Sequence, residues 1–384
     1  MEGGKIATLF KPFSQQKVPA DRAAKQRSFS MQYILPPHGG DVEFFRRRYP
    51  GHDWLDFSAS INPLGMPAAV RRALEDCGED SQRYPDPHSG ALREAIAAAE
   101  GVTAEQVLCG NGASDLIWRA VYALRPKQAM VCAPTFAEYR RALEAAGYAV
   151  RQHLLTPEDG FALDESILPL VERMDMVFLC NPNNPTGKLI DPPLLEKLCR
   201  AAHRAGTVLV VDECFLDFVP GGNTYSAKKY LRDCEKLIIL KAYTKIFAIP
   251  GVRLGHCLSH CPALLKAVDG AGPPWSVGVP AQRCGVLCAA QGEFVRVSQD
   301  SVRRWRKQLC EGMAALGLTV FPGAANYLLL RAKDPQLMEK LCEYGILIRD
   351  CRNFAGLGSG YFRVAVRTGK ENAALLGALE QILL

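Results

Sequence analysis

The sequence has no long apolar run, since none approaches the roughly 20 residues that a membrane-spanning helix needs. It also lacks the concentrated basic stripe of a nucleic-acid-binding protein, although 46 Lys and Arg against 40 Asp and Glu give a net charge of +6. The first 30 residues are too short for a DNA-binding domain and carry no helix-turn-helix pattern. Membrane and nucleic-acid proteins are therefore disfavoured, and 384 residues of ordinary composition fit a two-domain α/β enzyme for a small molecule.

A secretory signal and a disulfide framework are missing as well. Most of the 14 cysteines lie in apolar runs, where cysteine behaves as a small hydrophobic residue. Examples are Cys109, Cys132, Cys180 and Cys288. A reducing cytoplasm is therefore the expected location. The cluster His256, Cys257, His260 and Cys261 matches no standard zinc spacing, so no metal site is predicted.

Residues 1–30 form a basic segment with little apolar periodicity, and we expect a flexible extension there. A transit peptide is the alternative interpretation, but Glu2 and Asp21 interrupt its basic character. Our hypothesis is that the working chain starts near Met31, which mass spectrometry of the native protein would test.

Short β-branched runs alternate with longer amphipathic stretches through the middle of the chain. The predicted strands are residues 106–109, 128–132, 176–180, 208–212 and 237–241. The predicted helices between them are residues 114–124, 136–146, 192–205 and 225–233. This alternation is typical of βαβ units and predicts a mostly parallel sheet.

Polar clusters follow four of these strands. They are residues 110–114, 181–187, 212–213 and 244–245. Because parallel sheets bind ligands at the carboxyl ends of their strands, the four clusters can converge on one small molecule.

A smaller α+β domain is predicted after the Pro273-Pro274-Trp275 interruption. A long basic helix is expected over residues 294–316, followed by strands and two more helices. The expected strands are residues 318–321, 327–331, 346–349 and 362–366.

Lys245 is the candidate for a cofactor-bearing amine, because it lies among apolar residues where an unpaired lysine is costly. Burial lowers the pKa of a lysine toward that of a nucleophilic amine. Asp212 at the end of an apolar strand would keep a pyridine nitrogen protonated, and Asn184 would donate to the phenolic oxygen of the ring. Taken singly, these residues have ordinary interpretations as a surface lysine, a cap and a Pro/Asn turn.

A phosphate cradle is predicted where a helix opens directly after a strand, because its backbone amides and dipole favour an anion. The opening residues are Gly112, Ala113 and Ser114. Arg253 adds a positive charge and Thr244 a hydroxyl. Phe136 would stack on the cofactor ring, or else pack as an ordinary core residue.

In this combination the sequence resembles the fold-type I pyridoxal-phosphate enzymes, from about His38 to the C-terminus. The resemblance is carried by the Asn-Pro-Thr-Gly segment, the strand-end aspartate and the eight-residue spacing from Lys245 to Arg253. It implies an α/β, aspartate-aminotransferase-like fold with a large domain around a mostly parallel central sheet and a smaller α+β domain. The large domain would span residues 71–275 and the small domain 276–384, with residues 31–70 joining the small one. The implied cofactor is pyridoxal 5'-phosphate, held by Lys245 as a Schiff base.

Within these enzymes, the sequence is similar to histidinol-phosphate aminotransferases and to the threonine-phosphate decarboxylases of cobalamin biosynthesis. The segments most like the decarboxylases are residues 38–41, 55–65, 136–143, 244–251, 274–277, 346–351 and 362–368. Phe215 stands where the aminotransferases usually have a tyrosine that bonds the cofactor's oxygen. Ala242 replaces a serine or threonine that often helps to hold the phosphate.

The resemblance implies decarboxylation of L-threonine O-3-phosphate to (R)-1-amino-2-propanol O-2-phosphate. Arg363 would bind the substrate carboxylate, and Asn62 is a further expected substrate-binding residue. Candidates for the substrate phosphate are His38, Arg349 and Arg367. Tyr84 would reach the cofactor phosphate of a neighbouring subunit, which implies a homodimer with shared active sites. An aminotransferase for histidinol phosphate, a decarboxylase for serine phosphate and a non-catalytic regulator of the same fold are the alternatives.

Overall fold

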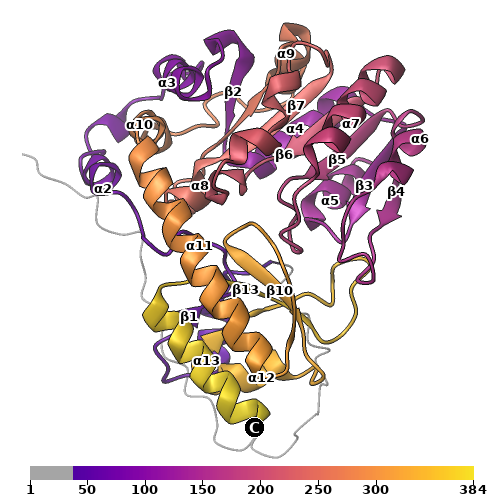
Figure 1. Cartoon of the computed structure of the whole chain (residues 1–384). Helices are drawn as coiled ribbons and strands as arrows, with labels where there is room; N and C mark the ends of the chain where they lie inside the picture. The colour runs from indigo at the N-terminus through magenta and orange to yellow at the C-terminus, as the bar shows by residue number, and fades with distance from the viewer. Residues whose placement is uncertain (1–37) are drawn as a thin grey trace, which may run out of the picture. The chain divides into compact units, whose positions relative to one another are not determined.

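The computed structural model describes residues 38–384, and its main features are two β-sheets and the helices around them (Figure 1). The expected basic extension at residues 1–30 and the expected start near Met31 lie outside the described residues. The domain boundaries taken from the sequence stay predictions.

The larger sheet has seven strands in the order β2-β8-β7-β6-β5-β3-β4. Strands β7, β6, β5, β3 and β4 run parallel, whereas β8 is antiparallel to both of its neighbours. The bounds are β2 (Val107–Gly110), β3 (Gln128–Ala133), β4 (Ala149–Leu154), β5 (Met176–Cys180), β6 (Val208–Asp212), β7 (Leu237–Ala242) and β8 (Gly255–Leu258). The expected mostly parallel sheet is confirmed, and β4 and β8 are additions to the five predicted strands.

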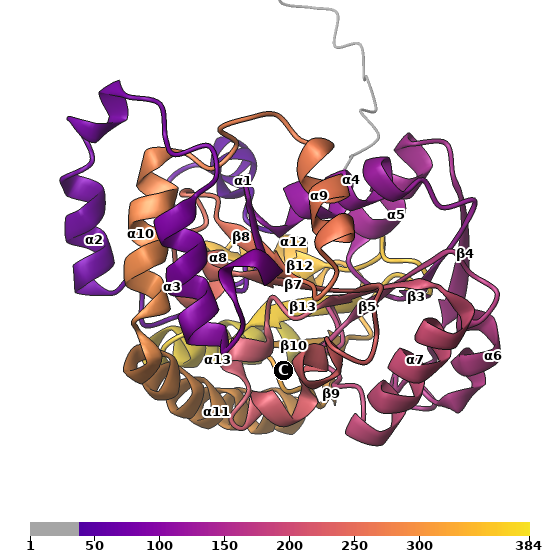
Figure 2. The same ribbon diagram turned by 90° about the horizontal axis from the view of Figure 1, so that it is seen from above.

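Alternate residues of each central strand enter two different apolar cores. In β5, Val177 and Leu179 pack with one helix layer, and Met176 and Phe178 pack with the other. Helices α4 (Ala113–Leu124), α5 (Ala137–Ala145) and α9 (Pro262–Gly270) cover one face, and α6 (Leu168–Val171) and α7 (Pro192–Ala205) cover the other (Figure 2). Each large apolar side chain buried in this way contributes about 1.5–3 kcal/mol, which explains why these strands are apolar on both faces.

The smaller sheet is antiparallel, with the order β12-β13-β10-β9. Its bounds are β9 (Thr319–Phe321), β10 (Tyr327–Arg331), β12 (Arg349–Asp350) and β13 (Tyr361–Ala365). Three helices belong to this part of the chain, namely α11 (Gly292–Ala315), α12 (Leu337–Cys342) and α13 (Gly369–Leu383). A separate pair forms where β1 (Leu55–Asp56) lies parallel to β11 (Ile346–Leu347), so a segment before residue 70 joins the C-terminal part.

The remaining helices are α1 (Val42–Arg48), α2 (Ala68–Glu75), α3 (Gly90–Glu100), α8 (Tyr243–Ile246) and α10 (Val279–Ala289). None of the helices within residues 38–384 is long and apolar enough to cross a membrane. All 14 cysteines are free. In the same residues, no group of three or more His, Cys, Asp or Glu side chains is arranged to hold a metal ion.

Two predicted elements differ from the structure. The helix expected over residues 225–233 is replaced by two short 3-10 turns, η5 (Gly222–Tyr225) and η6 (Ala227–Tyr230). The buried Glu213 carboxylate accepts hydrogen bonds from Ala227 N and Ser226 Oγ, and these contacts draw the chain out of a helical path. The strand expected over residues 346–349 is split, because β11 pairs with β1 whereas β12 pairs with β13.

Candidate active site

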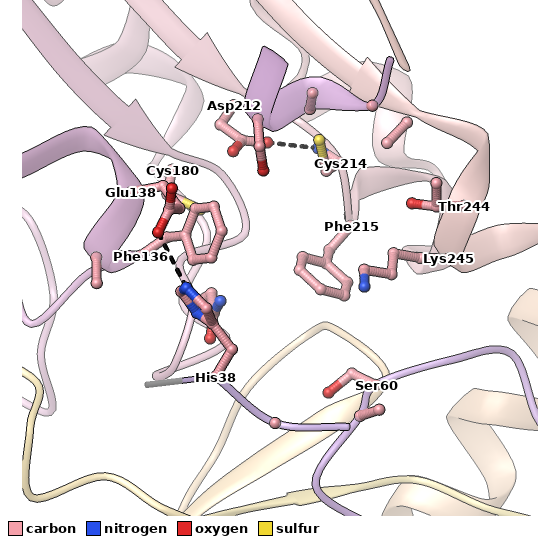
Figure 3. Close-up of a pocket in the computed structure, with 18 of the residues that line it drawn as sticks. His38, Ser60, Phe136, Glu138, Cys180, Asp212, Cys214, Phe215, Thr244 and Lys245 are labelled. Atoms are coloured by element: carbon pink, nitrogen blue, oxygen red, sulfur yellow. Dashed lines mark hydrogen bonds and ion pairs between the residues drawn. The ribbon is translucent and has the colours of Figure 1, made fainter. Parts of the chain in front are cut away.

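A pocket of about 480 Å³ lies at the carboxyl ends of the parallel strands, within the size range of small-molecule sites. Figure 3 shows residues from several distant segments around it, including Phe136, Asp212 and Lys245. The predicted site residues that line this pocket are His38, Gly112, Ala113, Ser114, Phe136, Asn184, Asp212, Thr244, Lys245, Arg253, Arg349 and Arg363. The predicted convergence of four strand ends is therefore present in the fold.

Lys245 lies in the single helical turn α8, directly after β7, and its amine points into the pocket toward the Phe215 ring (Figure 3). Burial is the main reason that the pKa of Lys245 falls to about 8, and the nearby Arg363 and Arg253 guanidinium groups contribute to this fall. A lysine with such a pKa has a substantial neutral fraction near neutral pH, as a nucleophilic amine needs.

Asn62 holds the Lys245 turn in place. Its backbone N–H donates to Lys245 O at 3.0 Å, and its side-chain amide donates to Ile246 O at 2.6 Å and Ser298 Oγ at 2.7 Å. Asn62 is buried and does not line the pocket, contrary to the expected contact with substrate. The structure instead uses this amide to join α8 to α11.

Asp212 ends β6 with its carboxylate buried on the pocket wall. One oxygen, Oδ1, accepts from the backbone N–H of Cys214 at 2.9 Å, as Figure 3 shows. The other, Oδ2, accepts from the Tyr139 hydroxyl at 2.6 Å. Both donors stabilise the charged carboxylate, which is the form needed to pair with a protonated ring nitrogen.

Arg363 of β13 lines the pocket and contacts residues of three other segments. Its Nη1 donates to Asn184 Oδ1 at 2.5 Å, its Nη2 donates to Ser58 O at 2.7 Å, and its guanidinium lies 5.3 Å from the Tyr327 ring centre. Arg363 Nε and the hydroxyl of Ser60 are both buried without a hydrogen-bond partner among residues 38–384. Two unsatisfied donors in one pocket indicate a polar ligand with acceptor atoms.

The predicted phosphate cradle forms at the start of α4. Gly112 has φ +84°, and a Cβ added there would lie 2.7 Å from Arg253 Nη2, so only glycine lets the guanidinium approach. Ala113 begins the 12-residue α4, whose first backbone N–H groups lack helical partners. Thr244 lines the same pocket. A helix N-terminus beside an arginine suits a bound phosphate.

His38, Arg141 and Arg349 also line the pocket. His38 Nε2 lies 2.9 Å from Glu138 Oε1, and Arg141 Nη1 lies 3.1 Å from the same oxygen. The His38 hydrogen bond is the main reason that the pKa of Glu138 falls to about 2. Arg349 is buried, donates to Asn353 Oδ1 at 2.7 Å and has its pKa lowered by burial.

Tyr84 and Arg367 are not brought to the pocket. The Tyr84 side chain is 79% exposed, with its ring centre 4.7 Å from that of Trp275. Arg367 pairs with Glu371 at 2.5 Å, beside the capping box that opens α13. Arg367 does not line the pocket, and its side chain pairs with the glutamate of that capping box, so its expected contact with substrate phosphate stays a prediction.

Several pocket residues carried no predicted role. Glu138 and Arg141 lie one helical turn apart on α5, and Ser58 and Ser60 follow β1. The sequence signal was available, because residues 136–143 and 55–65 already stood out as segments of resemblance. The sequence alone did not show that these four residues line the same pocket as Lys245.

The residues present fit pyridoxal phosphate. A buried amine of lowered pKa, a carboxylate held by two donors and an anion cradle that a Cβ would fill surround one space. Lys245 would carry the cofactor, Asp212 would face its ring nitrogen, and Gly112 and Arg253 would hold its phosphate.

Comparisons with known proteins agree with this geometry. The family model for aminotransferase class I and II matches residues 52–382. A threonine-phosphate decarboxylase of Salmonella typhimurium is 39% identical over 86% of this chain and 91% of that protein. The structure of a histidinol-phosphate aminotransferase from Sinorhizobium meliloti, in complex with pyridoxal-5'-phosphate, is similar with a TM-score of 0.82 and 20% identity, over 94% of this chain and 98% of that one.

An aspartate aminotransferase from Thermus thermophilus, solved with maleate, is similar in fold, with a TM-score of 0.77 and 24% identity over 89% of this chain and 94% of that one. These structures confirm the expected aspartate-aminotransferase-like fold. The chain belongs to the aminotransferase class I and II family and is an enzyme whose cofactor is pyridoxal phosphate.

Proposed function

We propose that the enzyme decarboxylates L-threonine O-3-phosphate to (R)-1-amino-2-propanol O-2-phosphate, the linker of the nucleotide loop of cobalamin. The observation that carries the proposal is a pair of buried arginines. Arg349 and Arg363 are direct cross-strand partners in β12 and β13, are 6% and 7% exposed, and both line the pocket. Like charges placed directly opposite each other are destabilising. A substrate with two anionic groups, such as a phosphorylated amino acid, would relieve this repulsion.

Each charged group has a role in positioning such a substrate. Arg363 binds the carboxylate through its planar guanidinium, and Arg349 and His38 bind the phosphate. Bound pyridoxal phosphate supplies an electron sink for the pair of electrons left when a bond to the α-carbon breaks. The bond from the α-carbon to the carboxylate breaks, carbon dioxide leaves, and the Lys245 amine holds the proton that is delivered to the α-carbon.

Phe215 favours decarboxylation over transamination in this proposal. It lies in the pocket wall with its ring centre 5.0 Å from that of Tyr327, and it brings no phenol to the cofactor. The Salmonella typhimurium relative, a threonine-phosphate decarboxylase, supports the same choice. A small rotation of the substrate separates the two reactions, so the product is the decisive evidence.

The test is incubation of the purified enzyme with L-threonine O-3-phosphate, without a keto-acid acceptor. We expect carbon dioxide and (R)-1-amino-2-propanol O-2-phosphate, and no turnover by Lys245→Ala. L-Serine O-3-phosphate run in parallel measures discrimination by one methyl group, worth about 1–3 kcal/mol. A reaction seen only with histidinol phosphate and a keto acid would instead assign an aminotransferase and refute the proposal.

Arg363→Ala tests the carboxylate contact. We expect KM for L-threonine O-3-phosphate to rise far more than the Kd for pyridoxal phosphate, because the guanidinium faces substrate. Arg367→Ala is the matched control, since that arginine pairs with Glu371 outside the pocket. An equal loss of substrate and cofactor affinity in Arg363→Ala would contradict the assignment.

We also propose that the enzyme is a homodimer in which Tyr84 reaches the cofactor phosphate of the partner. The exposed Tyr84 ring supports this, because its centre lies 4.7 Å from that of the exposed Trp275 ring, and the two form one apolar surface that a partner subunit would cover. Mixing inactive Lys245→Ala with inactive Tyr84→Ala subunits should restore part of the activity, and no recovery after subunit exchange would contradict shared sites.

A cytoplasmic location is proposed as well, since 14 free thiols suit a reducing compartment.

A further inference from the structure

Tyr139 lines the pocket beside Asp212 and contacts the carboxylate of that residue. Its hydroxyl donates to Asp212 Oδ2 at 2.6 Å, a short bond of the kind made to a charged acceptor. The other carboxylate oxygen is held by the backbone N–H of Cys214 at 2.9 Å. The carboxylate plane is therefore set by one backbone donor, which no side-chain substitution removes, and one side-chain donor.

The Tyr139 ring cannot turn away from this contact. The side chain is fully buried, and its ring stacks on Phe178 at 5.0 Å with an angle of 9° between the planes. On another side, Phe136 meets it edge to face at 5.6 Å and 83°. Phe136 lines the pocket on the same wall as Asp212 (Figure 3), so the tyrosine connects both groups that would face the cofactor ring.

The phenol is a permanent donor in this position. Burial and the neighbouring Asp212 charge hold the pKa of Tyr139 well above its usual value, so the hydroxyl keeps its proton at all working pH values. A hydrogen bond donated to a carboxylate is charge-assisted, and it fixes the direction in which the carboxylate points. In a buried site, this effect is larger than it would be in water.

We propose that Tyr139 is a positioning residue that orients the Asp212 carboxylate against the ring nitrogen of pyridoxal phosphate, so that this carboxylate can hold the proton on that nitrogen. The proposal rests on the assignment of Asp212 to the ring nitrogen. It does not depend on whether the enzyme decarboxylates or transaminates, because both reactions use the same electron sink. Without the hydroxyl, only the backbone N–H of Cys214 holds the carboxylate, which can then turn away from the ring nitrogen and leave its proton unpaired.

The test is ¹⁵N NMR of the enzyme loaded with pyridoxal phosphate labelled at the ring nitrogen. Tyr139→Phe keeps the stacked ring and removes only the hydroxyl, so we expect the ¹⁵N resonance to move toward that of an unprotonated pyridine. We also expect kcat to fall roughly 10- to 100-fold with KM little changed, as loss of a hydrogen bond to a charged group predicts. Tyr361→Phe is the control, because that tyrosine is also buried but lies outside the pocket.

A Tyr139→Phe enzyme whose ¹⁵N resonance matches the wild type overturns the proposal, whatever its activity. If the variant does not fold, 3-fluorotyrosine placed at position 139 replaces it, since a more acidic phenol should move the resonance toward the protonated form. An unchanged resonance in that protein also overturns the proposal. The product assay with L-threonine O-3-phosphate is a separate measurement, so failure of the decarboxylase assignment leaves this result interpretable.

Discussion

The Lys245 amine should capture pyridoxal phosphate with a pH dependence unlike that of an ordinary lysine. Burial, with Arg363 and Arg253 beside it, lowers the pKa of Lys245 from 10.5 to about 8. At pH 7, the neutral fraction is then about 9%, compared with about 0.03% for an unperturbed lysine. The reactive amine is therefore enriched roughly 300-fold by the pocket.

The assay is the rate at which cofactor-free enzyme takes up pyridoxal phosphate, followed by absorbance in a stopped-flow instrument between pH 6 and pH 10. We expect the rate to rise with pH, pass its midpoint near pH 8 and then level off, because above that pH the amine is already neutral. Lys245→Ala, which has no amine at this position, gives the background.

Arg363→Met adds a second expectation to the same titration. Removal of the guanidinium charge should raise the midpoint, but only part of the way to 10.5, since burial is the larger cause of the lowered pKa. A rate that keeps rising tenfold per pH unit beyond pH 9 in the wild type would refute the reasoning, because Lys245 would then titrate as an exposed lysine.

Three further predictions concern the framework of the site. Lys241 is buried, and its Nζ lies 2.6 Å from Glu100 Oε1. Lys241→Met should therefore lower the free energy of unfolding, measured in urea, by about 3–5 kcal/mol. The control Lys307→Met, at an exposed lysine, should change it little, and equal effects of the two substitutions would contradict the pairing. Burial raises the pKa of Glu213 from 4.5 to about 7, so its protonated form stabilises the fold at low pH and this contribution is lost as pH rises from 4.5 through 7. Glu213→Gln should remove up to about 3 kcal/mol of that decline in unfolding free energy, and an unchanged pH profile would contradict it. Gly112→Ala should weaken pyridoxal phosphate in equilibrium dialysis, because the new methyl group meets a guanidinium nitrogen at 2.7 Å, and an unaltered Kd would argue against the cradle.

Strands with strongly apolar sequences were predictable from the chain alone. Met176–Cys180 and Val208–Asp212 have the expected bounds, because every residue of each is buried and continuous apolar runs are typical of central parallel strands. The β4 strand, Ala149–Leu154, was missed because it lies at the sheet edge, where half-exposed polar residues break the apolar run. The β8 strand, Gly255–Leu258, was missed because it is four residues long and begins with glycine.

Some residues of the candidate site were likewise predictable from the sequence, and others were not. Lys245, Asp212 and Asn184 were predictable because their chemistry is set by the local sequence at a strand end. Asn62 and Arg367 were assigned to substrate, but their neighbours in space give them other partners, and those neighbours lie far away in the sequence or within a helix cap. Tyr139 lies in the segment 136–143 that stood out by resemblance, but its contact with the Asp212 carboxylate joins residues 73 positions apart and could not be predicted from the sequence.

Close packing of backbone decides whether the distant parts of the site meet. Gly255 in β8 is the partner of Gly110 in β2 and of Ala242 in β7, so it lies between the strand that leads to the phosphate cradle and the strand that leads to Lys245. A Cβ at Gly255 would overlap the backbone nitrogen of Ala113, the first residue of α4. Any larger residue at position 255 must push the phosphate cradle away from β7, and the backbone amide that would bind phosphate moves with the cradle. The distance between the anion cradle and the reactive amine therefore depends on a residue that has no side chain and touches no ligand.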